Sequence, residues 1–294
     1  MSELTRKEKE ELFRKTIASE RERAAYARTW AQLILEKLPA EVNVRNIFTV
    51  DELPDRAVPV YTIDLPYINA WVLPKMGSHP INLVTTEEVT IPTFEITGNV
   101  EYKEQFARDG RFNVAERAQQ RLMDSIVDQE EEAGWAVLKA ASQATNQVDA
   151  SDLYGTGEAG ITKKILNAVF VKFEERRGYK CTAVYASAKG LASIRDWEAT
   201  KIDPTTQREI FVGAGLEGLW GATLNVSHRL GEDECFAFDT RPGLLGFMPI
   251  RENLRTFDDP TAIKKFRVGV IAYEEVGFGV LDSDRIVEVI NISF

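Results

Sequence analysis

Residues 111–141 read RFNVAERAQQRLMDSIVDQEEEAGWAVLKAA, and this stretch has the greatest influence on the expected fold. Its apolar side chains recur mostly at three- and four-residue intervals, as on one face of an α-helix. They are Ala115, Ala118, Leu122, Ile126, Ala133, Val137 and Ala141. The pattern predicts a helix over 113–141, with about 28 residues and a length of about 42 Å. Helices in globular domains typically have about 11 residues, so the fold must accommodate an unusually long helix.

Upstream of this helix, residues 58–92 combine β-forming runs such as PVYTI, NAWVL and EVTI with repeated prolines. Each proline lacks the N–H that a central strand needs, so this stretch favours a long, edge-type β-hairpin. On an isolated hairpin Trp71, Leu73 and Met76 would be exposed. Apolar groups on a projecting element usually contact a partner, so these residues are candidates for contacts between subunits.

The rest of the chain alternates shorter helices and strands. An amphipathic helix is expected over 3–38, followed by a loop over 40–57. After the long helix we expect a second helix over about 160–177 and a polar excursion over 251–260. The expected strands cover 93–102, 180–187, 221–227, 235–239, 244–250, 266–282 and 285–294, with a short helix over 189–197.

The composition excludes several classes of protein. A chain of 294 residues with 44% hydrophobic and 28% charged residues is an ordinary globular composition. The net charge of −10 argues against a protein that wraps nucleic acid by neutralising its phosphates, although it suits a container for DNA. No segment approaches the roughly 18 consecutive apolar residues of a membrane span. The first residues, MSELTRKEKEELFRK, are charged where a signal peptide would be apolar, so we expect a cytoplasmic protein.

Side chains that carry chemistry are scarce. Cys181 and Cys235 both stand in apolar runs, which predicts buried free thiols. The two histidines, His79 and His228, offer little material for a histidine-based catalytic or metal site. The acidic run 128–132 is expected to be a solvated helix face. We therefore expect no enzyme activity, no metal and no cofactor.

Two glycine-rich segments resemble nucleotide-binding motifs. GAGLEG, residues 213–218, has the spacing of a dinucleotide fingerprint, but β-prone residues follow it where the mechanism needs a helix. GTGEAGIT, residues 155–162, has the glycine spacing of a phosphate loop, but Ile161 stands where the lysine belongs. The expected structures are a flexible turn and a loop that enters a helix. An α/β nucleotide-binding enzyme remains the less favoured alternative.

The order of elements resembles the α+β major capsid fold of tailed bacteriophages, which encapsulins share. That fold has an N-terminal arm, an extended β-hairpin loop, a long spine helix, and peripheral and axial domains. The resemblance covers essentially the whole chain and rests on layout, because the family has no short invariant motif. It implies a helical arm and linker at 1–57, the extended loop at 58–92, a peripheral domain at 93–179 and 249–294 with spine helix 113–141, and an axial domain at 180–248.

The resemblance also implies a function. The chain would be a major capsid protein that assembles as pentamers and hexamers into an icosahedral shell, located in the virion and in the host cytoplasm during assembly. An encapsulin shell is the alternative. Many relatives carry a long cleavable scaffold region before the fold. Here the helix 3–38 stands in that place, so a separate scaffolding protein or none is implied, together with a portal and weak, non-specific contact with DNA.

Some relatives of this fold join a lysine of the extended loop to an asparagine of a neighbouring peripheral domain. By segment, Lys75 and Asn253 are the candidates. Such a bond needs a neutral amine and a nearby carboxylate base. Glu252 is merely adjacent to Asn253 in the sequence, so we expect a solvated lysine, an ordinary turn asparagine and no cross-link.

Overall fold

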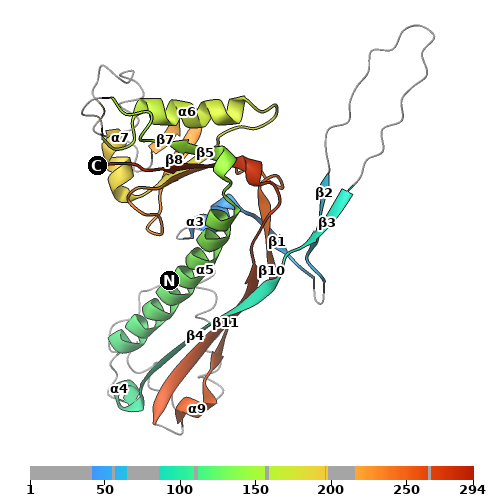
Figure 1. Cartoon of the computed structure of the whole chain (residues 1–294). Coiled ribbons are helices and arrows are strands. Elements are labelled where there is room, and N and C mark those ends of the chain that lie inside the picture. Colours follow the sequence, from blue (N-terminus) through green and yellow to red (C-terminus); the bar gives the residue numbers. More distant parts are fainter. Residues whose placement is uncertain are drawn as a thin grey trace, which may run out of the picture.

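The computed structural model describes most of the chain from Val42 onward (Figure 1). The predicted helix 3–38 lies outside the described residues, and so do Trp71, Leu73, Lys75 and Met76. The described ranges are 42–54, 57–64, 86–108, 112–155, 159–195, 197, 216–263 and 266–294.

The first sheet contains the longest strands. β10 (Gly246–Asp258) and β11 (Arg267–Gly277) are antiparallel, and β11 pairs along its whole length with β4 (Thr93–Lys103). β1 (Thr49–Glu52) runs parallel to β10 on the other side, and β12 (Gly279–Val280) pairs with the start of β10. Among the described strands the order is therefore β1-β10-β11-β4.

The second sheet is mixed, with the strand order β5-β13-β9-β6-β8-β7. Helices α6 (Lys163–Glu174) and α7 (Ala188–Arg195) contribute the side chains packed on one of its faces. Thr162 caps α6, because its hydroxyl accepts a hydrogen bond from the N–H of Ile165. The strands are β5 (Gln147–Asp149), β13 (Ile286–Ile290), β9 (Cys235–Phe238), β6 (Ala183–Ala186), β8 (Ala222–Val226) and β7 (Leu216–Leu219).

Strands β6 and β9 are buried on both faces. Successive side chains of a strand point to opposite faces, so each strand supplies two separate cores. Tyr185, Phe236 and Phe238 belong to the core shared with the long helix. Val184 and Ala237 belong to the core under α6 and α7.

The long helix α5 (Phe112–Ala141) connects the two sheets and confirms the predicted helix. Its first half packs on the first sheet, where a Cβ at Gly98 would lie 3.3 Å from Ile126 Cδ1. In its second half Trp135 lies 5.7 Å from the ring of Tyr185 and 5.9 Å from that of Phe236. Figure 1 shows α5 running from the end near α4 (Glu104–Arg108) to the second sheet. Its length follows from the single core that it forms with both sheets.

The predicted hairpin is present at its base. β2 (Val60–Asp64) and β3 (Thr86–Thr90) are antiparallel and form a separate two-stranded sheet. Figure 1 shows this pair projecting away from the two larger sheets.

Two predicted loops are wrong. Within 40–57, helix α3 (Asn43–Ile47) and strand β1 place Val44, Ile47 and Phe48 in the core. The polar excursion expected at 251–260 is the second half of β10, followed by the short helix α9 (Pro260–Ile263). There Leu254 and Thr256 are buried while their neighbours face outward, so the segment is an amphipathic strand with many charged residues.

Strand pairing also divides the chain differently from the expected domain boundaries. β5 and α6 fall within 93–179, and β13 within 249–294, yet all three share the second core with β6 and β9. Grouped by sheet, the first unit holds β1, β4, β10, β11 and β12 with α5. The second holds the six-stranded sheet with α6 and α7.

Candidate assembly surfaces and buried charged groups

The base of the projecting hairpin is fastened to the first sheet by aromatic and polar contacts. The ring of Tyr61 stacks on Phe247 at a centroid distance of 4.4 Å. Its hydroxyl donates to Asp51 Oδ2 at 2.7 Å, and Arg251 Nη2 donates to the carbonyl of Ala57 at 3.4 Å. Burial and the hydrogen bond to Asp51 both raise the pKa of Tyr61, so its hydroxyl stays a donor. The hairpin therefore leaves the body at a defined position.

Apolar side chains are exposed around this base. Val58 and Val60 open onto solvent at the start of β2, and Val50 does so on the neighbouring strand β1. Isolated exposed valines are ordinary, but three near the root of a projecting element favour contact with a partner.

A second exposed apolar group lies where β10 and β11 approach α9. Phe266 is 77% exposed at the start of β11, and Phe257 is half exposed near the end of β10. Phe266 also has a φ of 54°, an uncommon backbone conformation for a side chain of this size. The sequence signal that could have found both is an aromatic residue flanked by charges, in KKFR and TFDD.

Asn253 is the one predicted contact residue that the structure describes. It lies exposed on β10, and its neighbour Glu252 pairs with Arg255 at 3.5 Å. Because Lys75 lies outside the described residues, the structure does not test whether the two candidates for a cross-link approach each other.

The acidic run on α5 is solvated only in part. Asp128 and Glu132 are exposed as predicted, but the prediction is wrong for the two glutamates between them. Glu130 is fully buried and Glu131 is 6% exposed. Arg45 of α3 binds Glu130 through two hydrogen bonds, from Nε to Oε1 at 2.5 Å and from Nη2 to Oε2 at 3.1 Å. Glu274 of β11 approaches the same guanidinium at 3.8 Å and is 1% exposed. Two buried carboxylates from different elements thus share one arginine.

Glu131 holds the N-terminal end of α3. Its Oε1 accepts hydrogen bonds from the backbone N–H groups of Asn43 and Val44, which begin that helix. Its Oε2 accepts from Trp135 Nε1 at 2.8 Å. A carboxylate at a helix N-terminus satisfies N–H groups that have no partner within the helix. Gly134 makes room for this docking, because a Cβ there would lie 2.8 Å from Val44 Cγ2.

A polar network joins the chain connections between the two sheets. Asp239, just after β9, is buried and binds Arg241 and Arg285 at 2.5 Å each. Burial would raise the pKa of Asp239, but the hydrogen bond from Arg241 and the charges of both arginines outweigh it and hold that pKa below its usual range. Arg285 also pairs with Asp282 at 3.0 Å.

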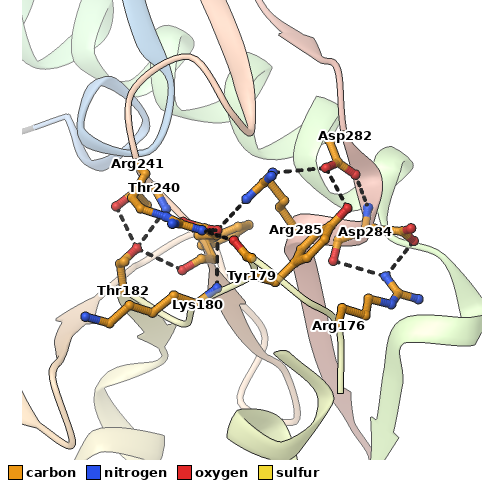
Figure 2. Close-up of polar contacts among 12 residues, drawn as sticks. Arg176, Tyr179, Lys180, Thr182, Thr240, Arg241, Asp282, Asp284 and Arg285 are labelled. Carbon is orange, nitrogen blue, oxygen red and sulfur yellow. Dashed lines mark hydrogen bonds and ion pairs between the residues drawn. The ribbon is translucent and has the colours of Figure 1, made fainter. Parts of the chain in front are cut away.

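The same network reaches the end of α6 (Figure 2). Arg176 pairs with Asp284 at 2.7 Å, and the Tyr179 hydroxyl donates to Asp282 Oδ2 at 3.0 Å. Asn146, in the connection from α5 to β5, donates to Asp284 Oδ1 at 3.2 Å. The links α5–β5, β9–β10 and β12–β13 are therefore tied together, which fixes how the two sheets are joined.

The nucleotide-binding motifs do not have the surroundings that their chemistry requires. The second half of GAGLEG lies in β7, and strand β8 follows, as expected, in place of a helix. The end of GTGEAGIT leads through Gly160, with a φ of 74°, into α6. The prediction of a loop entering a helix is confirmed there, although α6 begins at Lys163.

The described residues also bear on the cysteines, on groups suited to a metal ion and on helices that could span a membrane. Cys181 and Cys235 are free and buried as predicted, and burial raises the pKa of each thiol to about 12. Within the described ranges, His, Cys, Asp and Glu side chains form no group of three suited to a metal ion. None of the helices in that part of the chain is long and apolar enough to cross a membrane.

Comparisons with known proteins give a consistent result for the fold. No family model and no curated protein matches the sequence. The capsid of a native GTA particle is similar, with 15% identity, a TM-score of 0.60, and coverage of 86% of this chain and 91% of that one. Gordonia phage Cozz matches with 11% identity, a TM-score of 0.60, and coverage of 86% and 85%. An encapsulin complex from Synechococcus elongatus PCC 7942 matches with 13% identity, a TM-score of 0.52, and coverage of 84% and 86%.

These likenesses extend over 84–86% of this chain and over 85–91% of the three chains that it matches. The chain therefore has the fold found in tailed-phage capsid subunits and in encapsulin.

Proposed function

We propose that this chain is the major capsid protein of a tailed bacteriophage and builds the icosahedral shell around the packaged DNA. The observation that carries this proposal is the likeness to shell subunits over more than four-fifths of the chain. The geometry supports it further. Exposed apolar side chains mark two separated places, the base of the hairpin and the end of the first sheet near α9. A shell subunit needs several contact regions for different neighbours.

The two sheets have distinct parts in this proposal. The six-stranded sheet with α6 and α7 would be the axial domain, which meets its copies in pentamers and hexamers. The first sheet with α5 would be the peripheral domain, and residues 58–92 would reach over an adjacent subunit. A separate scaffolding protein and a portal would be the partners during assembly. Contact with DNA would be weak, since the net charge is −10.

An encapsulin shell is the second candidate, because the Synechococcus elongatus structure shares the fold. The content of purified shells distinguishes the two: nuclease-protected phage DNA for a capsid, and an enclosed enzyme for an encapsulin. The nucleotide-binding alternative loses its support, because β8 follows GAGLEG where a helix is needed.

The first prediction is assembly. Expressed alone or with its scaffolding protein, the chain should form capsomers or closed shells in the megadalton range, because its contact regions are spread over several elements. Sedimentation velocity and electron microscopy provide the measurement. A persistent monomer across salt and protein concentration, with the scaffolding protein present, would contradict the proposed function.

The second prediction concerns the hairpin. Trp71→Ala combined with Leu73→Ala should weaken assembly and leave the subunit folded, because burying each side chain against a neighbour contributes roughly 1.5–3 kcal/mol. Critical concentration for assembly and circular dichroism measure the two effects. Gln120→Ala, an exposed change on α5 outside the proposed contact regions, serves as the control. Loss of secondary structure in the double variant would instead place these residues in the subunit core.

The third prediction is the absence of a covalent cross-link. Shells should dissociate in denaturing electrophoresis to one band of monomer mass, because Asn253 is exposed on β10 and the adjacent Glu252 is already paired with Arg255. A ladder of multimers that disappears with Lys75→Ala would show that the bond forms.

A further inference from the structure

Helix α3 is held in place by charged groups that it does not contain. It has five residues, which is too short for an isolated helix to persist in water. Glu131 caps its first N–H groups, and Glu130 binds its single arginine, Arg45. The position of α3 therefore depends on the charge state of the groups around it.

The charges around Arg45 do not balance when all groups are ionised. Glu130 and Glu274 together carry two negative charges, and Arg45 supplies one positive charge. Glu274 Oε1 is buried and has no hydrogen-bond partner among the described residues. A proton on one of the two carboxyl groups would neutralise the cluster, and an excess charge in a buried site is costly.

Among the described residues, the other elements packed around the cluster supply no compensating charge. On β4, Ile96 stands opposite Glu274, and on β10 Leu254 is buried. On α5, Glu131 is occupied with the start of α3 and with Trp135, and its charge faces Tyr185 on β6. Within the described part of the chain, Glu130 and Arg45 are the charged groups that act on Glu274.

We propose that Arg45, Glu130 and Glu274 form a one-proton latch that holds α3 against α5 and β11. The latch is closed when one of the two carboxyl groups carries a proton and loosens when both are ionised. All three groups belong to one chain, so the latch operates whether or not shells form.

The direction of the pH effect follows from the surroundings of Glu274. Burial, and next the charge of Glu130, raise its pKa from 4.5 to about 8. A folded-state pKa above the unfolded value means that the stabilisation is complete at low pH. It is lost as the pH rises from about 4.5 to about 8, so the latch loosens under mildly alkaline conditions.

Hydrogen–deuterium exchange of residues 43–48, corrected for the intrinsic pH dependence of exchange, tests the latch on the full chain. Between about pH 6 and about pH 9, protection in the native protein should fall roughly tenfold or more, as linkage to a shifted carboxyl requires. Glu274→Gln keeps the shape but cannot ionise, so its protection should fall much less over this range. The fall that remains would come from Glu131, whose pKa burial also raises. Glu130→Gln leaves Arg45 paired with Glu274 alone and should move the fall to lower pH.

Glu132→Gln is the matched control, because it makes the same chemical change at an exposed position of the same helix. It should reproduce the native profile. A flat profile in the native protein would overturn the latch. So would an equal fall in the native protein and Glu274→Gln. Since the readout is local exchange, a failure here is distinct from a failure to assemble.

Discussion

Trp135→Ala is expected to lower the free energy of unfolding by about 3–5 kcal/mol, as truncation of a buried aromatic side chain usually does. The indole is 2% exposed and lies within 5.9 Å of the rings of Tyr185, Phe236 and Phe238. Removing it opens a cavity between α5 and the second sheet. It also removes the N–H that Glu131 accepts at 2.8 Å, which weakens the group that caps α3.

Urea unfolding of the unassembled chain, followed by far-UV circular dichroism, measures the loss. Trp135→Phe separates the two causes, because it keeps most of the packing but deprives Glu131 of a hydrogen bond. That variant should lose about 1–3 kcal/mol. Trp220→Ala is the exposed control, with an expected change below about 1 kcal/mol. Equal losses at the two tryptophans would mean that α5 does not rest on the second sheet as described.

The sequence predicts the long helix well, because its apolar residues repeat with helical spacing over many turns. The helix observed over Phe112–Ala141 agrees with the expected 113–141. Periodicity alone could not show that the helix packs on two different sheets within one core. That depends on strands β6 and β9, which lie far along the chain and bury both of their faces.

The burial of Glu130 can be read from its spacing along α5, although the neighbouring charges make this hard to see. Leu122, Ile126, Glu130, Gly134 and Leu138 follow one another at four-residue intervals, so Glu130 lies on the buried stripe of α5. A run of adjacent acidic residues favours a solvent-exposed face, but the position of each residue on the helix decides whether it is buried. The small residue Gly134 in the same stripe marks the place where α3 approaches.

Glu274 is detectable in the same way. On β11 the inward positions are Val268, Val270, Ala272, Glu274 and Val276, an alternation that the glutamate continues. Its partner could not be predicted, because Arg45 lies in a segment that looked like a loop. The same alternation in β10 is hard to see in the sequence, since charged residues surround Leu254 and Thr256. Contacts among distant segments could not be predicted either. The pairing of β13 with β9 places β13 in the unit of the second sheet, although the expected boundaries put residues 249–294 in the other domain.

Arg45→Met is expected to lower the free energy of unfolding by about 3–5 kcal/mol, the usual loss when one partner of a buried ion pair is removed. Methionine fills a similar volume but leaves Glu130 and Glu274 without a cation. Burial already raises the pKa of Glu130 against the opposing effect of Arg45, so without the arginine both carboxyl groups should bind protons more tightly. The loss should therefore be smaller at about pH 5 than at about pH 8.

Arg255→Met provides the matched control, because its pair with Glu252 is largely exposed and contributes about 0–1 kcal/mol. Arg45→Lys keeps the charge but cannot make both hydrogen bonds to Glu130, so its loss should be intermediate. Urea unfolding at the two pH values measures all three variants. If Arg45→Met lost more stability at the lower pH, the carboxyl groups would not be binding protons in place of the arginine. If it lost no more than Arg255→Met, α3 would be held by packing of Val44 and Ile47 rather than by its buried charges.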